Sequence, residues 1–472
     1  MPTEVPMLEP HIRGISLHDI TGRRHLFLNS EASEESYSLS RPVEKLDIFL
    51  SHSWSGSPFW KHMTLVTNLY VKFGYIAMLV TVIPLSVATY FLPAGKREAV
   101  AATQVLGGFA MFFGMWFGYL VPNRTNKRMV FLDKCCIPQV DLAAMKEGLT
   151  NMEAYLNRSD KLLILWTPEY FSRLWCVFEL ASYLRSHGPN SIACLSARFG
   201  RFYHVVVWFE IAFIIIAESV NAAIPSNTQI QRWVPYACWS VTEAALSVGV
   251  GLIVLFYCVP AKMELNKQIQ HFSMTSAQCT FTEDTALLTC RISEWYGSQE
   301  NFDNCIRDSW PRISTAMKTS DSALPIEIVA FVMFPYVMAL CPRLACAIAW
   351  NNEFREYSWS VIIRSTLLLH VLLACRTPLF VVISYRMGNV LEYKSTLAKC
   401  FYITVVVLFA LLYSVTQLIA TQGVLFFYGP PAMVLFTNSS YPWFFVILPI
   451  TAVALVYWTH CPRCVLSNHP AV

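Results

Sequence analysis

The sequence predicts a multi-pass α-helical membrane protein, of about eight spans, that carries a small cytoplasmic α/β domain with a parallel sheet. The chain has 472 residues, of which 55% are hydrophobic and 14% are charged, and its mean hydropathy is +0.43. A soluble globular protein has roughly 25% charged residues. This composition excludes a wholly soluble or disordered chain. The net charge of +4 is too balanced for a nucleic-acid binder.

Eight apolar stretches are long enough to cross a hydrocarbon core, which needs about 20 residues per helix. They lie near residues 72–92, 99–121, 203–224, 235–259, 326–350, 360–385, 398–420 and 442–459. On one side of these spans the connections carry only Lys96, Arg97, Arg232 and Arg355. The positive-inside bias therefore predicts that both termini face the cytoplasm, and the lipid bilayer is the first expected partner.

The segments outside the spans divide the chain further. Residues 1–43 are polar and contain no apolar core of a signal peptide, which favours a disordered cytoplasmic tail. Residues 44–71 and 122–202 are expected to form one domain that a transmembrane hairpin at 72–121 interrupts. The remaining parts are a second hairpin at 203–259, a cytoplasmic helical segment at 260–325, four transmembrane helices at 326–459 and a tail at 460–472.

Short apolar runs, each followed by polar residues, predict the strands of this domain. The runs are Leu46 to Leu50, Met129 to Leu132, Lys161 to Trp166 and Ser191 to Leu195. Helical spacing of apolar residues predicts helices at 142–156 and at about 174–184. Strands that alternate with helices indicate a parallel sheet.

The same segments resemble the TIR (Toll/interleukin receptor) domain family. The resemblance runs through Asp47 to Ser51, Phe131 to Asp133 and, most specifically, Tyr170, Ser172, Trp175-Cys176 and Glu179-Leu180. It covers about 100 residues, roughly a fifth of the chain. Membrane spans stand where the family has its first helix, and the family's last strand and helices are absent. The resemblance therefore implies a truncated version of the domain, interrupted by a transmembrane hairpin.

Many TIR domains cleave the nicotinamide–ribose bond of NAD with the glutamate of this motif, so the resemblance assigns the catalytic role to Glu179. Ligands of open α/β sheets bind beyond the carboxyl ends of the strands, where this chain has Ser51, His52, Trp54 and Asp133. These four residues are the expected binding residues. NAD would be a substrate, and no cofactor is required. The structural alternative for Glu179 is a solvated carboxylate on a helix.

Three functions follow from these features. The first is signalling through self-association of the TIR-like domain, as a homo-oligomer or with other TIR domains. The second is hydrolysis of NAD at Glu179. The third is an ion or solute transporter or channel, suggested by ionisable residues within the spans, which otherwise serve as interhelical ion pairs. These residues are Glu210, Glu218, Glu243, Arg343, Arg364 and Arg376.

Two further patterns remain. Cys135-Cys136 is expected to pack in a loop rather than bind metal, because no second ligand pair has zinc spacing. Apolar residues from Phe302 to Met317 recur at helical spacing, so this face is expected to contact either the interrupted domain or the membrane surface.

Overall fold

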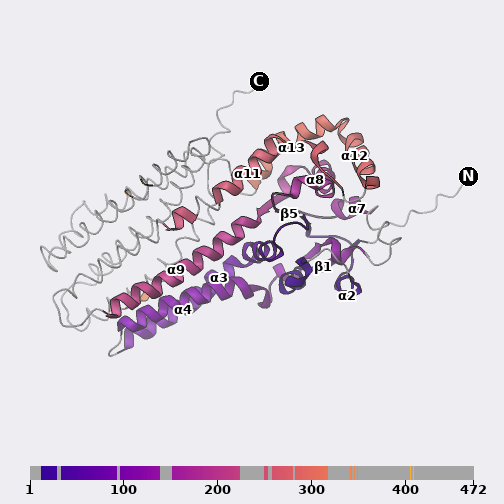
Figure 1. Ribbon diagram of the computed structural model, residues 1–472. Coiled ribbons are helices and arrows are strands. Elements are labelled where there is room, and N and C mark those ends of the chain that lie inside the picture. The colour runs from indigo at the N-terminus through magenta and orange to yellow at the C-terminus, as the bar shows by residue number, and fades with distance from the viewer. Residues whose placement is uncertain are drawn as a thin grey trace, which may run out of the picture. The chain divides into compact units, whose positions relative to one another are not determined.

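The computed structural model describes residues 12–28, 33–92, 96–138, 151–223, 249–253, 258–279 and 282–316, with a few isolated positions beyond residue 340 (Figure 1). The chain divides into two units. The first comprises Met1–Leu69, Tyr119–Arg201 and Ala261–Thr319, and the second comprises Tyr70–Gly118, Phe202–Pro260 and Ser320–Val472. The spans predicted after residue 326, and most of 235–259, lie outside the described residues.

The first unit contains a mixed six-stranded sheet with the order β2-β1-β4-β3-β5-β6. Strands β4, β3, β5 and β6 are parallel, as predicted, whereas β1 is antiparallel to both β2 and β4. The prediction of an all-parallel sheet is therefore wrong at one edge. The strands are β1 (Ile12–Ser16), β2 (Arg41–Val43), β3 (Ile48–His52), β4 (Met129–Phe131), β5 (Leu162–Trp166) and β6 (Ile192–Ser196).

The two central strands β3 and β4 come from opposite sides of the apolar hairpin in the sequence. Ile48 faces Val130 and Phe49 faces Phe131 in a parallel ladder. The backbone N–H of Asp47 donates to the carbonyl of Met129 at 2.8 Å, and the Phe49 and Phe131 rings stack with centroids 4.3 Å apart. Pairing of these two runs, which the sequence predicts, is confirmed.

The amino-terminal segment differs from its prediction. Residues 12–28 and 33–43 are part of the first unit, so the expectation of a disordered tail is wrong for them. Strand β1 lies between β2 and β4, and Ile12 and Ile15 are fully buried. The sequence did not predict this strand because only two of its five residues are apolar. Its pairing with β2 and β4, which lie far from it in the sequence, stabilises it as a strand.

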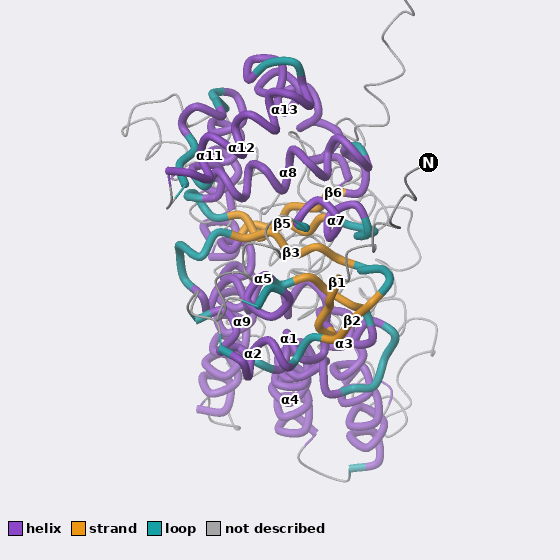
Figure 2. Tube along the Cα trace, turned by 90° about the vertical axis from the view of Figure 1, so that its right-hand side faces the viewer, coloured by secondary structure: helices purple, strands orange, loops and turns teal. Residues whose placement is uncertain are grey.

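The helices of the first unit gather in two groups around the sheet, as Figure 2 shows. On one side α13 contacts β6, and α12 packs on α8 and α13; on the other, α1 and α5 contact β1, and α2 packs on α5. The bounds are α1 (Leu17–Gly22), α2 (Glu34–Ser38), α5 (Asp133–Cys136), α7 (Met152–Asn157), α8 (Leu174–His187), α11 (Val259–Gln270), α12 (Thr282–Tyr296) and α13 (Gln299–Ala316). Of the helix predicted at 142–156, only the part from Met152 is described, as α7.

The last described helix of this unit, α13, carries the apolar face that was expected to contact either the interrupted domain or the membrane surface. Phe302, Ile306, Trp310 and Ile313 on α13 are buried and belong to the same hydrophobic core as the sheet. The Tyr296 hydroxyl donates to the carbonyl of Ala181 on α8 at 2.8 Å. The segment therefore packs on the interrupted domain.

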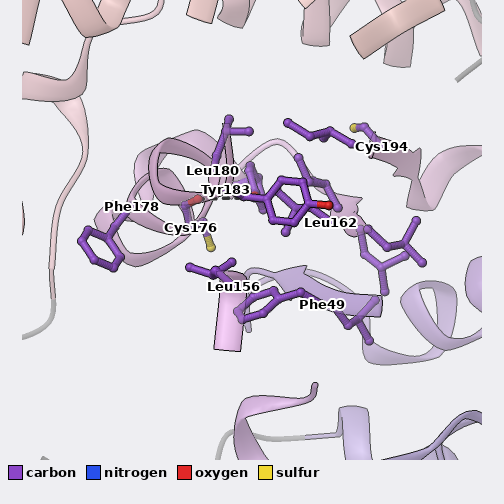
Figure 3. Close-up of a cluster of buried hydrophobic side chains, with 14 of the residues drawn as sticks. Phe49, Leu156, Leu162, Cys176, Phe178, Leu180, Tyr183 and Cys194 are labelled. Atoms are coloured by element: carbon purple, nitrogen blue, oxygen red, sulfur yellow. Dashed lines mark hydrogen bonds between the residues drawn. The ribbon is translucent and has the colours of Figure 1, made fainter. Parts of the chain in front are cut away.

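α8 is buried around most of its circumference in the core of the first unit (Figure 3). The helix buries Leu174, Val177, Phe178, Ala181 and Leu184, the residues that its spacing predicts. It ends at His187, and Gly188 follows with φ 71°, a left-handed conformation that favours glycine. Trp175 and Glu179 lie on the narrow stripe of α8 that is only partly buried.

The described part of the second unit is helical. It contains most of α3 (Pro58–Phe91), α4 (Lys96–Phe117) and α9 (Ala197–Ala223), which cover the first three predicted spans. Two described helices, Pro58–Phe91 and Glu98–Lys127, are long and apolar enough to cross a membrane. Val80, Val87 and Phe113 are at least half exposed on these helices. Outward apolar side chains of this kind are expected where lipid is the solvent.

Candidate functional site

The site is built around Glu179, which α8 directs toward the carboxyl end of β3. Ser51, near the end of β3, donates a hydrogen bond of 2.5 Å from Oγ to Oε2 of Glu179. The Tyr170 hydroxyl lies 2.7 Å from the same Ser51 Oγ and 3.4 Å from the carbonyl of Cys176. A continuous polar chain therefore links Glu179 to the loop after β5.

Burial raises the pKa of Glu179 to about 8. The Ser51 hydrogen bond opposes this shift because it stabilises the anion, whereas the nearby charge of Asp133 adds to it. Part of the Glu179 side chain remains exposed to solvent. Glu179 therefore exchanges its proton close to neutral pH, which is the property of a general acid or base. The alternative of an ordinary solvated carboxylate does not fit this environment.

Asp133 and Trp54 meet at the neighbouring strand ends. The indole Nε1 of Trp54 donates to Oδ2 of Asp133 at 3.0 Å. Asp133 begins α5 directly after β4, so the sheet brings together two residues that are far apart in the sequence. Three of the four predicted binding residues thus lie near the predicted catalytic residue Glu179. They are Ser51, Trp54 and Asp133.

His52 does not have the predicted character of a ligand-binding residue. It is buried between aromatic side chains, with ring centroids 5.7 Å from Phe27 and 4.6 Å from Trp54. Burial lowers the pKa of His52. Nδ1 lies 3.2 Å from the carbonyl of Ser53, and Nε2 has no hydrogen-bond partner. His52 is thus a neutral packing residue that supports Trp54.

Lys61 is the site residue that sequence reasoning missed. It lies in the first turn of α3, ahead of the predicted span, and is fully buried. Its Nζ donates to the carbonyls of Ser53 at 2.7 Å and Ser55 at 3.2 Å, so it holds the loop that carries Trp54. Burial lowers the pKa of Lys61, against the opposing charge of Asp133. The available signal was a basic residue in the first turn of the long helix, ahead of its apolar stretch.

The cysteines near the site are structural. Cys135, Cys136 and Cys176 are buried members of the hydrophobic core. Burial raises the pKa of all three thiols, which keeps them protonated and unreactive. Within the described part of the chain, no three His, Cys, Asp or Glu side chains are grouped to hold a metal ion. The packing role predicted for Cys135 and Cys136 agrees with this burial.

The arrangement as a whole offers one titratable acid, a second carboxylate, an indole and a buried ammonium at adjoining ends of parallel strands. In open α/β sheets this edge is where ligands bind. Perturbed ionisable groups gathered in such a place are typical of functional sites.

No family model, curated protein or solved structure matches this chain. The assignment of a function therefore depends on the geometry of the described residues.

Proposed function

We propose that this chain is a membrane-anchored, TIR-like enzyme that hydrolyses the nicotinamide–ribose bond of NAD with Glu179. In this proposal the domain consists of the first unit, faces the cytoplasm, and is held there by about eight spans with both termini inside. The exposed apolar side chains of α3 and α4 and the distribution of basic residues support the membrane part.

The observation that carries the proposal is the position of Glu179 against Ser51. The residue assigned by motif resemblance lies at the carboxyl end of β3, 2.5 Å from Ser51, with Asp133 within electrostatic reach. A domain that acts only by self-association has no need of two carboxylates held close together in a partly buried place, where their desolvation and mutual repulsion cost free energy. The cluster therefore favours catalysis over the signalling role that the sequence alone puts first.

The chemistry is a displacement at the anomeric carbon. The C–N bond breaks, and its electron pair leaves with nicotinamide, which becomes neutral. A water oxygen bonds to the ribose carbon, and its proton passes to the Glu179 carboxylate. Before that transfer the anion stabilises the positive charge that develops on the ribose. Asp133 adds negative potential, and the indole of Trp54 offers a surface for a base to stack on.

This mechanism needs the ionised form of Glu179. With a pKa of about 8, roughly a tenth of the free enzyme is ionised at pH 7. The kcat/KM for NAD is therefore expected to rise about tenfold between pH 7 and pH 9 and then level off.

The test is release of nicotinamide from NAD by the purified full-length protein in lipid nanodiscs, followed by chromatography. Glu179→Gln is expected to lower kcat by at least about a hundredfold, as loss of an acid–base group usually does. Glu300→Gln, the same change at an exposed carboxylate on α13, is expected to leave the rate unchanged. A folded wild-type protein that dimerises yet leaves NAD intact would instead support signalling by self-association.

A further inference from the structure

A second ionisable group is buried away from the candidate site. Glu210 lies on α9 in the second unit, and its side chain is fully buried. Neither of its carboxyl oxygens has a hydrogen-bond partner. The basic residues that the sequence suggests as ion-pair partners lie outside the described residues; they are Arg343, Arg364 and Arg376. A carboxyl buried in this way is costly to keep and therefore calls for an explanation.

Two other helices bring unpartnered polar groups to the same unit. The hydroxyl of Tyr75 on α3 and the amide nitrogen of Gln104 on α4 are both buried without a hydrogen-bond partner. Tyr75 lies within electrostatic reach of Glu210. The unpartnered hydroxyl of Tyr75 is the independent observation that distinguishes this place from a lone buried acid.

Helix α4 contacts both α3 and α9 at two adjacent residues, Met111 and Phe112. A Cβ atom at Gly74 of α3 would lie 2.7 Å from the carbonyl oxygen of Met111 on α4. The ring of Phe112, also on α4, lies 4.6 Å from that of Trp208 on α9. Gly74 directly precedes Tyr75, and Trp208 lies two residues before Glu210. Tyr75 of α3 and Glu210 of α9 therefore lie within two residues of these contacts.

The chemistry of these groups points to a proton rather than a metal ion. Hard cations such as Ca²⁺ and Mg²⁺ need about six or more oxygen ligands, and one carboxyl with one phenol falls well short. An ionised carboxylate without donors pays a large desolvation cost, whereas the neutral acid pays far less. Two turns before Glu210 on α9, Nε2 of His204 already accepts a hydrogen bond from the Trp116 indole at 2.6 Å.

We propose that Glu210, with Tyr75 beside it, is a proton-binding site between helices α3, α4 and α9. In this proposal burial without donors holds the Glu210 carboxyl in its neutral form, and its proton is the ligand. The site is separate from Glu179, so its test does not depend on NAD cleavage.

The test uses two carbodiimides on the full-length protein in native membranes, with peptide mass spectrometry as the readout. Dicyclohexylcarbodiimide is lipid-soluble and reacts with protonated acids: the acid proton moves to a carbodiimide nitrogen while the carboxyl oxygen bonds to the central carbon. It is expected to label Glu210. The matched control is Glu98, an exposed carboxylate near the start of α4. A water-soluble carbodiimide with an amine is expected to label Glu98 and spare Glu210.

The Glu210→Gln variant, which resembles the neutral acid in shape and charge, is expected to lose the label at this site. Absence of the lipid-soluble label from wild-type Glu210 would overturn the proposal, as would equal labelling by the water-soluble reagent. Protection of Glu210 by added sodium or potassium would also overturn it, because the ligand would then be a metal cation. Should Glu210→Gln fail to fold, the two reagents on the wild-type protein still decide the question.

Discussion

The environment of Glu179 predicts an unusual response of stability to pH. The pKa of this carboxyl is about 8 in the folded protein and 4.5 when unperturbed. Below pH 4.5 the group is protonated in both states and costs nothing. Between pH 4.5 and 8 the folded protein must retain a proton that the unfolded chain has released. Stability from this group is therefore fully present below pH 4.5 and is lost as pH rises toward 8.

Replacing Glu179 by Gln removes this cost and keeps an oxygen that can accept the Ser51 hydrogen bond. Each pH unit above 4.5 corresponds to about 1.4 kcal/mol. Three units to pH 7.5 give about 4 kcal/mol as an upper value, and partial exposure of the side chain reduces this to about 2–4 kcal/mol. The Glu179→Gln protein is therefore expected to be more stable than the wild type at pH 7.5, by a few degrees in unfolding midpoint.

The assay is thermal unfolding in detergent at pH 5 and pH 7.5, with midpoints compared between wild type, Glu179→Gln and the exposed control Glu300→Gln. The gain in Glu179→Gln is expected to be large at pH 7.5 and small at pH 5, and the control is expected to match the wild type at both. A Glu179→Gln protein that is less stable at pH 7.5, or whose gain is equal at both values, would refute the reasoning.

Three further predictions concern the scaffold. Lys61→Met removes the hydrogen bonds that hold loop 53–57, so amide hydrogen exchange there is expected to accelerate; unchanged exchange would show that Lys61 does not hold the loop. Ile15, on β1, is fully buried, so Ile15→Ala is expected to destabilise the first unit by about 2–4 kcal/mol in thermal unfolding. An unchanged stability would show that β1 is not part of the folded unit. Gly74→Ala places a methyl group against the Met111 carbonyl and is expected to cost about 1–3 kcal/mol, measured as a lower unfolding midpoint; an unchanged midpoint would mean that the two helices are not in close contact.

The central strands and α8 could be predicted because apolar patterning determines them. Each of the four parallel strands, β3 to β6, coincides with a short apolar run in the sequence. The buried residues of α8 recur at helical spacing. The first strand is shifted by two residues, since Ser51 and His52 close β3 rather than open a loop. β1 and β2 could not be found in this way, because their pairing is decided by neighbours distant in the sequence.

The sequence predicted which residues would form the candidate site, but not how their side chains contact one another. The resemblance pointed to Glu179, and the strand ends pointed to Ser51, Trp54 and Asp133. The contact between Ser51 and Glu179 spans 128 residues, and no local pattern encodes such a pairing. Lys61 was not predicted as part of the site because it binds backbone carbonyls of a loop, and which carbonyls it meets depends on the fold rather than on a sequence motif.

The central claim is that two chain segments, separated by an apolar helical hairpin, form adjacent strands of one sheet. A photo-crosslink tests this most directly. Phe49 is replaced with p-azidophenylalanine and native membranes are irradiated, because the centroids of the Phe49 and Phe131 rings are 4.3 Å apart. Mass spectrometry is expected to find the crosslink on the peptide that contains Phe131. Crosslinks confined to residues before the hairpin, with none on β4, would contradict the account.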